Sequence, residues 1–170
     1  MAKGRSHEKL EARLGYRFAD PGLLERALTH ASALSPSKRI ANSYQRLEFL
    51  GDRVLGLVVA DLLYRRLPNA NEGELNRSLV RLVRKEACAA IARELDLGLH
   101  LNLGEAEART GGAEKDAILS DVTEAVFAAV YLDGGFGKAF EVVERLLGSQ
   151  FEVSLNLRAD PKTTLQEWAQ

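Results

Sequence analysis

Two pairs of carboxylates lie within otherwise apolar segments of this sequence. Glu48 and Asp52 fall in RLEFLGDRVLGLVVADLLYRRL, and Asp121 and Glu124 fall in AILSDVTEAVFAAVYL. Because an α-helix advances about 100° per residue, side chains spaced i,i+4 or i,i+3 project from one face. Four carboxylates that converge in a partly apolar site repel one another, and a bound cation would keep them ionised. Hard oxygen ligands favour Mg²⁺ or Mn²⁺ over zinc, so the pattern indicates a metal centre.

The residues alone leave a simpler interpretation open. On an amphipathic helix, Glu48 and Asp52 could be solvated side chains that pair with a neighbouring arginine such as Arg53. This interpretation is weaker for Asp121 and Glu124, because apolar residues surround their helix as they do in a buried helix.

The elements that must position these acids are predicted to be helices, because apolar residues recur at helical spacing and alternating β-branched runs are nearly missing. We therefore expect an all-α domain. Asp20-Pro21 is a helix-start signal, Pro68 closes a long helix, and Gly134-Gly135 breaks another. Helices are expected over 7–14, 21–30, 44–67, 71–98, 118–132 and 138–147, with irregular segments over 31–43 and 99–116.

Composition limits the class of protein. The chain has 170 residues, 46% of them hydrophobic, which is enough for one sizeable core, and a net charge of −1 argues against a generally basic nucleic-acid coat. A single cysteine, Cys88, predicts no internal disulfide, a core position and a reducing compartment. No signal peptide and no run of about 18 apolar residues is evident, so a cytoplasmic location without membrane contact is expected.

Three segments carry a family resemblance: NSYQRLEFLGDRVLGL at 42–57, NEGELNRSLVRLV at 71–83 and GGAEKDAILSDVTEAVFAAVYLDGGF at 111–136. Together they resemble the endonuclease domain of the ribonuclease III family, over nearly the whole chain. The final DPKTTLQEWAQ resembles the opening helix of the double-stranded-RNA-binding domain that follows in bacterial members. We therefore assign 1–155 to the endonuclease domain and 156–170 to a linker and the truncated start of the second domain. A C-terminal helix that docks Trp168 on the core is the alternative.

The resemblance implies a homodimeric helical enzyme that requires Mg²⁺, with Mn²⁺ able to substitute, and no small-molecule cofactor. Such an enzyme cuts both strands of double-stranded RNA and leaves 5′-phosphate and 3′-hydroxyl ends with short 3′ overhangs. Its expected roles are the processing of ribosomal RNA precursors and the turnover of messenger RNA.

The family's metal-binding carboxylates fall on Glu48, Asp52, Asp121 and Glu124 without substitution, and Asp52 and Glu124 are the expected catalytic pair. Glu72, in the family's EG-x-L motif, is expected to line the same acidic valley. Two positions depart from the family pattern: Gln45 replaces an acidic residue before RLEFLGD, and Ala113 replaces a basic residue in the GG-x-x-K segment.

Hydrolysis of a phosphodiester needs water as the nucleophile and stabilisation of the charge on the phosphate, both of which a divalent metal supplies. No side-chain nucleophile is evident, since Ser120 has no histidine near it in the sequence and Cys88 lacks a Cys-His context. His7, His30 and His100 show no metal-ligand spacing, and we interpret them as structural.

Dimer and RNA contacts are expected at two further places. Alone, Phe49 would be assigned to the core, but in the family the matching phenylalanine inserts into a pocket of the partner subunit. A basic stripe on the helix after Asn71 is a candidate for phosphate contact, although such a stripe is more often only a solvated face. Its members are Arg77, Arg81, Arg84 and Lys85.

Two other functions stay open. One is a dimeric module that binds double-stranded RNA without cutting it, which loss of one of the four acids would favour. The other is a helical metal-dependent phosphohydrolase acting on small phosphate esters. That class usually shows paired His-Asp ligands or a phosphate-binding glycine loop, which this sequence lacks.

Overall fold

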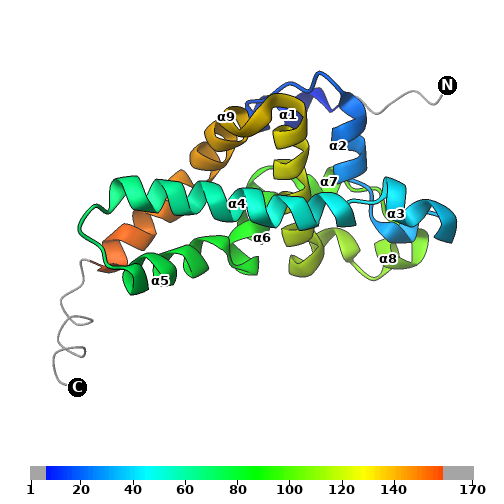
Figure 1. Ribbon diagram of the computed structural model, residues 1–170. Helices are drawn as coiled ribbons and strands as arrows, with labels where there is room; N and C mark the ends of the chain where they lie inside the picture. The colour runs from blue at the N-terminus through cyan, green and yellow to red at the C-terminus, as the bar shows by residue number, and fades with distance from the viewer. Residues whose placement is uncertain (1–6, 159–170) are drawn as a thin grey trace.

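The computed structural model describes residues 7–158, and its regular elements are helices (Figure 1). The predicted all-α class is confirmed. In chain order the helices are α1 (Glu8–Leu14), α2 (Pro21–Ala27), α3 (Arg39–Asn42), α4 (Gln45–Arg66), α5 (Glu72–Val83), α6 (Lys85–Glu94), α7 (Leu97–His100), α8 (Glu105–Arg109) and α9 (Asp116–Arg158). Short 3-10 turns lie at Ala31–Ala33, Pro36–Lys38 and Gly112–Glu114.

The core forms where α9 crosses α4 and packs on α6. The first half of α9 is buried almost all round, with Val122 and Phe127 fully buried, as its continuous apolar sequence predicts. Leu55 of α4 and Ile91 of α6 cover it from two sides. A helix enclosed in this way gives its few polar side chains fixed directions, and two of them are predicted metal ligands.

The predicted helix starts and stops are confirmed where their signals are local. The Asp20 side chain accepts a hydrogen bond from the Gly22 N–H at 2.9 Å, and Gly15 ends α1 with a φ of 63°. However, α2 ends before His30, because the chain at Thr29 pairs with Asn102 in an isolated parallel bridge.

The single helix predicted over 71–98 is wrong. It is divided into α5, α6 and α7, because Arg84 is extended (φ −66°, ψ 157°) and Asp96 is left-handed (φ 53°). The turn at Arg84 allows Leu82 and Cys88 to point into the same core from two differently directed helices. Asn71 begins α5 with a reciprocal capping box, as its position predicts.

The predicted pair of helices at 118–132 and 138–147 corresponds to α9, which bends at Gly135 (φ 80°, ψ 177°) and continues well past 147 to Arg158. The two segments predicted as irregular contain short helical turns. The assignment of 156–170, including Trp168, falls mostly outside the described residues. None of the helices that the structure describes combines the length and apolarity needed to cross a membrane.

Candidate active site

A close contact between helix backbones brings the two acid pairs together. A Cβ atom at Gly51 would lie 1.8 Å from the backbone oxygen of Glu124, so only glycine allows α4 and α9 to cross at this distance. Glu48 and Asp52 flank Gly51 on α4, and Asp121 lies one turn before Glu124 on α9. The crossing therefore places both predicted pairs around one point.

The charges of these acids act on one another. Burial raises the pKa of Glu124 to about 8, with further increases from the negative charges of Asp52, Glu48 and Asp121, and Arg53 opposes them. Burial also raises the pKa of Glu48, followed by the charges of Asp121 and Asp52. At Asp121 burial again raises the pKa. The four acids thus form one electrostatic unit at the crossing of α4 and α9.

The donor set suits a hard divalent cation. Glu48, Asp121 and Glu124 are half-buried, whereas the Asp52 side chain is 51% exposed and pairs with Arg53 at 2.6 Å. The side chains stand apart: within residues 7–158, no three Asp, Glu, His or Cys side chains lie in the arrangement of a metal-binding cluster. Carboxylate oxygens open to water on one side are the ligands that Mg²⁺ prefers.

Sequence reasoning missed Tyr44 as part of this site. Its side chain is 3% exposed, and its hydroxyl donates to Oδ2 of Asp121 at 3.4 Å. Burial raises the pKa of Tyr44, as do the charges of Asp121 and Glu48, so the phenol keeps its proton. The signal in the sequence was the i,i+4 spacing of Tyr44 and Glu48 at the start of α4.

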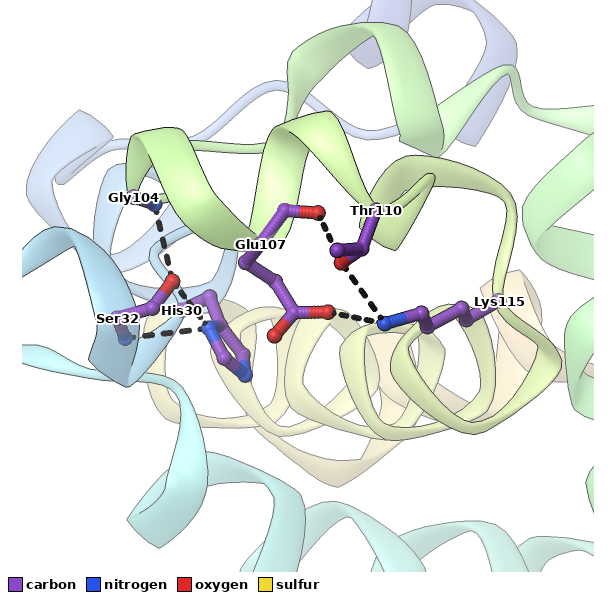
Figure 2. Close-up of polar contacts among 6 residues, drawn as sticks. All are labelled: His30, Ser32, Gly104, Glu107, Thr110 and Lys115. Atoms are coloured by element: carbon purple, nitrogen blue, oxygen red, sulfur yellow. Dashed lines mark hydrogen bonds and ion pairs between the residues drawn. The ribbon is translucent and has the colours of Figure 1, made fainter.

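Two sets of polar contacts lie near Tyr44: one joins His30, Ser32 and Gly104, and the other joins Glu107, Thr110 and Lys115 (Figure 2). The His30 ring lies 5.6 Å from the Tyr44 ring, and its Nδ1 contacts Ser32. Glu107 pairs with Lys115 at 2.6 Å, and its charge reaches Tyr44. The hydrogen bond from Lys115 lowers the pKa of Glu107. His30 and Glu107 therefore border the site, although no local spacing indicated it.

Glu72 lies in the first turn of α5 and is exposed. It is not among the described groups that shift the pKa values of Glu48, Asp121 and Glu124. Its place in the acidic valley stays a prediction. At the two departures from the family pattern, the Ser43 hydroxyl donates to Gln45 at 3.5 Å, and the Ala113 carbonyl packs against Gly98.

The predicted continuous basic stripe is wrong, because the helix breaks within it. Arg77 and Arg81 lie on α5, Lys85 begins α6, and Arg84 is the extended residue between them, 3.8 Å from Glu86. The positive charge of Lys85 acts on Asp121. Lys85 is therefore the member of the set that borders the acids.

Phe49 is not a core residue of this chain, as the sequence taken alone would suggest. Its side chain is 66% exposed on α4, with the guanidinium of Arg53 stacked 4.3 Å from its ring centroid. Leu57 (58% exposed) and Tyr64 (75%) follow at intervals of eight and seven residues, on the same side of the helix. These three residues form an apolar face of α4 that the described chain leaves uncovered.

The core position predicted for Cys88 is confirmed, and the structural role expected of the histidines stays a prediction. Cys88 is fully buried, as expected. His7 and His100, which are far apart in the sequence, lie side by side with their Nδ1 atoms 3.3 Å apart. The charge of His30 acts on Asp121.

Comparison with known proteins gives consistent matches. A family model described as Ribonuclease-III-like matches residues 20–150. Ribonuclease 3 of Azorhizobium caulinodans is 52% identical over 170 residues, covering 100% of this chain and 72% of that protein. Ribonuclease 3 of Ruegeria pomeroyi is 56% identical over 161 residues, covering 94% and 70%. Ribonuclease 3 of Rhodopseudomonas palustris is 52% identical over 161 residues. That match covers 95% of this chain but only 59% of the longer relative.

Solved structures agree with the fold. The nuclease domain of ribonuclease III from Campylobacter jejuni, described as flexible in a region involved in dimer formation, matches with a TM-score of 0.81 and 40% identity. The match covers 86% of this chain and 99% of that domain. Dicer from Pichia stipitis shares the fold at a TM-score of 0.59 and 23% identity, over 79% of this chain and 57% of that one.

Proposed function

The chain belongs to the ribonuclease III family of endoribonucleases, and on that premise we propose that it hydrolyses double-stranded RNA to 5′-phosphate and 3′-hydroxyl ends. The observation that carries the proposal is the helix crossing at Gly51, around which the charges of Asp52, Glu48 and Asp121 act on Glu124. A non-cleaving RNA-binding dimer is the alternative, and the presence of all four acids counts against it.

Family membership implies a divalent metal, and we propose Mg²⁺, with Mn²⁺ able to substitute, held by these four carboxylates. When bound, the metal supplies an activated water and neutralises charge on the scissile phosphate. Asp52 faces solvent, from which RNA would approach, and Glu124 is more deeply buried. Because burial raises the pKa of Glu124 to about 8, this residue would release a proton to bind a cation near neutral pH. Asp52 and Glu124 are the proposed catalytic residues.

The proposed active unit is a homodimer with two-fold symmetry. The apolar face of α4 formed by Phe49, Leu57 and Tyr64 is exposed along a rigid helix that also carries Glu48 and Asp52. A two-fold contact uses the same patch on both protomers and would bury this face. Each protomer would then present one set of acids to one RNA strand.

RNA would be held mainly through its phosphates and shape, since the base edges of an A-form duplex lie in a deep groove. Lys85 borders the acids, and Arg77, Arg81 and Arg84 extend the positive charge along α5 and the break after it. Processing of ribosomal RNA precursors and messenger RNA turnover, in the cytoplasm, are the proposed roles. Residues 156–170 are proposed to open an RNA-binding domain, with 1–155 as the nuclease domain.

The test is cleavage of a long labelled RNA duplex at low salt with Mg²⁺ or with EDTA. Single-stranded RNA and DNA duplex of the same sequence are the controls. Cutting of duplex RNA in Mg²⁺ alone, lost in Glu124→Gln, is the expected result. Duplex binding by a dimer without any cutting would instead support the binding module.

A further inference from the structure

We propose that Tyr44 is a positioning residue of the metal centre, which orients Asp121 through its hydroxyl and is itself held by His30. The inference rests on the proposed function, because it concerns the same four acids. It adds two residues, from outside the acid-bearing turns, to the machinery of the site.

The Tyr44 backbone is fixed from both sides. Its N–H donates to the Thr29 carbonyl at 2.9 Å, and its own carbonyl accepts from the Glu48 N–H at 2.8 Å. The side chain is buried, so its ring has few other orientations available. The hydroxyl that reaches Oδ2 of Asp121 at 3.4 Å is thus carried on a rigid support.

The His30 ring lies beside the Tyr44 ring and is itself held by its own hydrogen bonds. Its N–H donates to the Asn102 carbonyl at 3.0 Å, and its Nδ1 accepts from the Ser32 N–H at 3.1 Å and lies 2.7 Å from the Ser32 hydroxyl. The Ser32 hydroxyl in turn accepts from the Gly104 N–H at 2.9 Å (Figure 2). With Nδ1 accepting, the imidazole orientation is set, and its ring centroid lies 5.6 Å from that of Tyr44, with the two rings tilted by 52°.

Asp121 stands among groups of both charges, and so benefits from a partner that fixes its orientation. Its negative charge acts on the carboxylates of Glu48 and Glu124. The positive charges of Lys85 and His30 act on Asp121 in turn. A hydrogen bond on Oδ2 holds that oxygen and leaves Oδ1 available to a cation. Partners that orient a ligand in this way typically contribute about 10- to 100-fold to metal affinity.

The test is a titration of the RNA-free protein with Mn²⁺, in which electron paramagnetic resonance measures the concentration of the unbound ion. Tyr44→Phe keeps the ring and removes only the hydroxyl, and we expect about 10-fold weaker Mn²⁺ binding. The matched control is Tyr16→Phe, which removes a hydroxyl that donates to Asp133 at 2.7 Å; neither residue is among the described groups that act on Glu48, Asp121 or Glu124. Its Mn²⁺ affinity should equal that of the unaltered protein.

Cleavage assays give a second readout. In Tyr44→Phe, added Mg²⁺ should restore kcat while KM for RNA stays unchanged, a pattern that general loss of structure would not produce. Circular dichroism checks the fold. His30→Phe keeps an aromatic ring but removes the hydrogen bonds to Ser32, and it should also weaken Mn²⁺ binding, by a smaller factor than Tyr44→Phe.

Two outcomes would overturn the inference, and they differ. Unchanged Mn²⁺ affinity in both Tyr44→Phe and His30→Phe, with tight binding by the unaltered protein, removes the role of Tyr44 and leaves the proposed function intact. Failure of the unaltered protein to bind Mn²⁺ and to cut duplex RNA removes the proposed function and this inference with it.

Discussion

Gly51→Ala adds one methyl group at the point where α4 and α9 touch. The new carbon would lie 1.8 Å from the Glu124 carbonyl oxygen, and ordinary contact begins at 3.4 Å, so the helices must separate by about 1.6 Å. The obstacle is backbone of a buried helix, which cannot swing aside as a side chain can. The acids on α4 therefore move away from those on α9.

The expected cost in free energy of unfolding is about 3 kcal/mol for the overpacking. Alanine's better helix propensity offsets about 1 kcal/mol of it. The net loss of about 2 kcal/mol lowers Tm by roughly 4–8 °C in a domain of this size. Because a displacement of about 1 Å costs roughly 10²-fold in rate, duplex cleavage should fall by at least that factor.

The matched control is Gly56→Ala on the same helix, where an added Cβ meets nothing within 4 Å. This variant should be as stable as the unaltered protein or more stable by up to about 1 kcal/mol, with full cleavage. Thermal denaturation, Mn²⁺ binding and initial cleavage rates are measured for both. If Gly51→Ala melts and cuts like Gly56→Ala, the helix crossing does not set the spacing of the acids, and the reasoning is refuted.

Three further perturbations test other parts of the structure. Phe49→Asp places a charge on the exposed face of α4 and should give a monomer by size-exclusion chromatography with light scattering, whereas an unchanged dimer would exclude this face from the interface. Glu124 binds its proton more tightly in the folded chain than in the unfolded one, so its contribution is full below about pH 4.5 and is lost as pH rises towards 8. Tm in EDTA should therefore fall across that range, and Glu124→Gln should flatten the fall; equal slopes would contradict the assignment. Asp133→Ala removes the acceptor of the Tyr16 hydroxyl and of two backbone N–H groups, so Tm should drop by a few degrees, about 1.5 kcal/mol, with cleavage per folded molecule unchanged.

Features with local causes could be predicted from the sequence. The capping residues Asp20 and Asn71 act within one turn, and each acid pair is set by the periodicity of one helix. The all-α class follows from the same local periodicity. The family motif supplied what local rules could not, namely that the two pairs meet.

Features caused by long-range packing could not be predicted. The segment LVRKEACAA has continuous helix propensity, yet it breaks at Arg84 because the residues on both sides must reach one core. Tyr44 and Asp121 are 77 residues apart, so their hydrogen bond has no sequence spacing to indicate it. Phe49 looks like a core residue, because composition does not say which face of a helix its own chain leaves uncovered.

The helix crossing at Gly51 also has a consequence for synthesis of the chain. Helix α4 carries two of the four site acids and α9 carries the other two. The complete set forms only when the two helices dock, and this docking is a non-local contact made late in folding. During translation α9 follows α4 by some fifty residues of chain. A nascent chain that has released α4 but not α9 therefore holds no assembled centre, and the RNA-rich surroundings of the ribosome meet this nuclease only as a nearly finished domain.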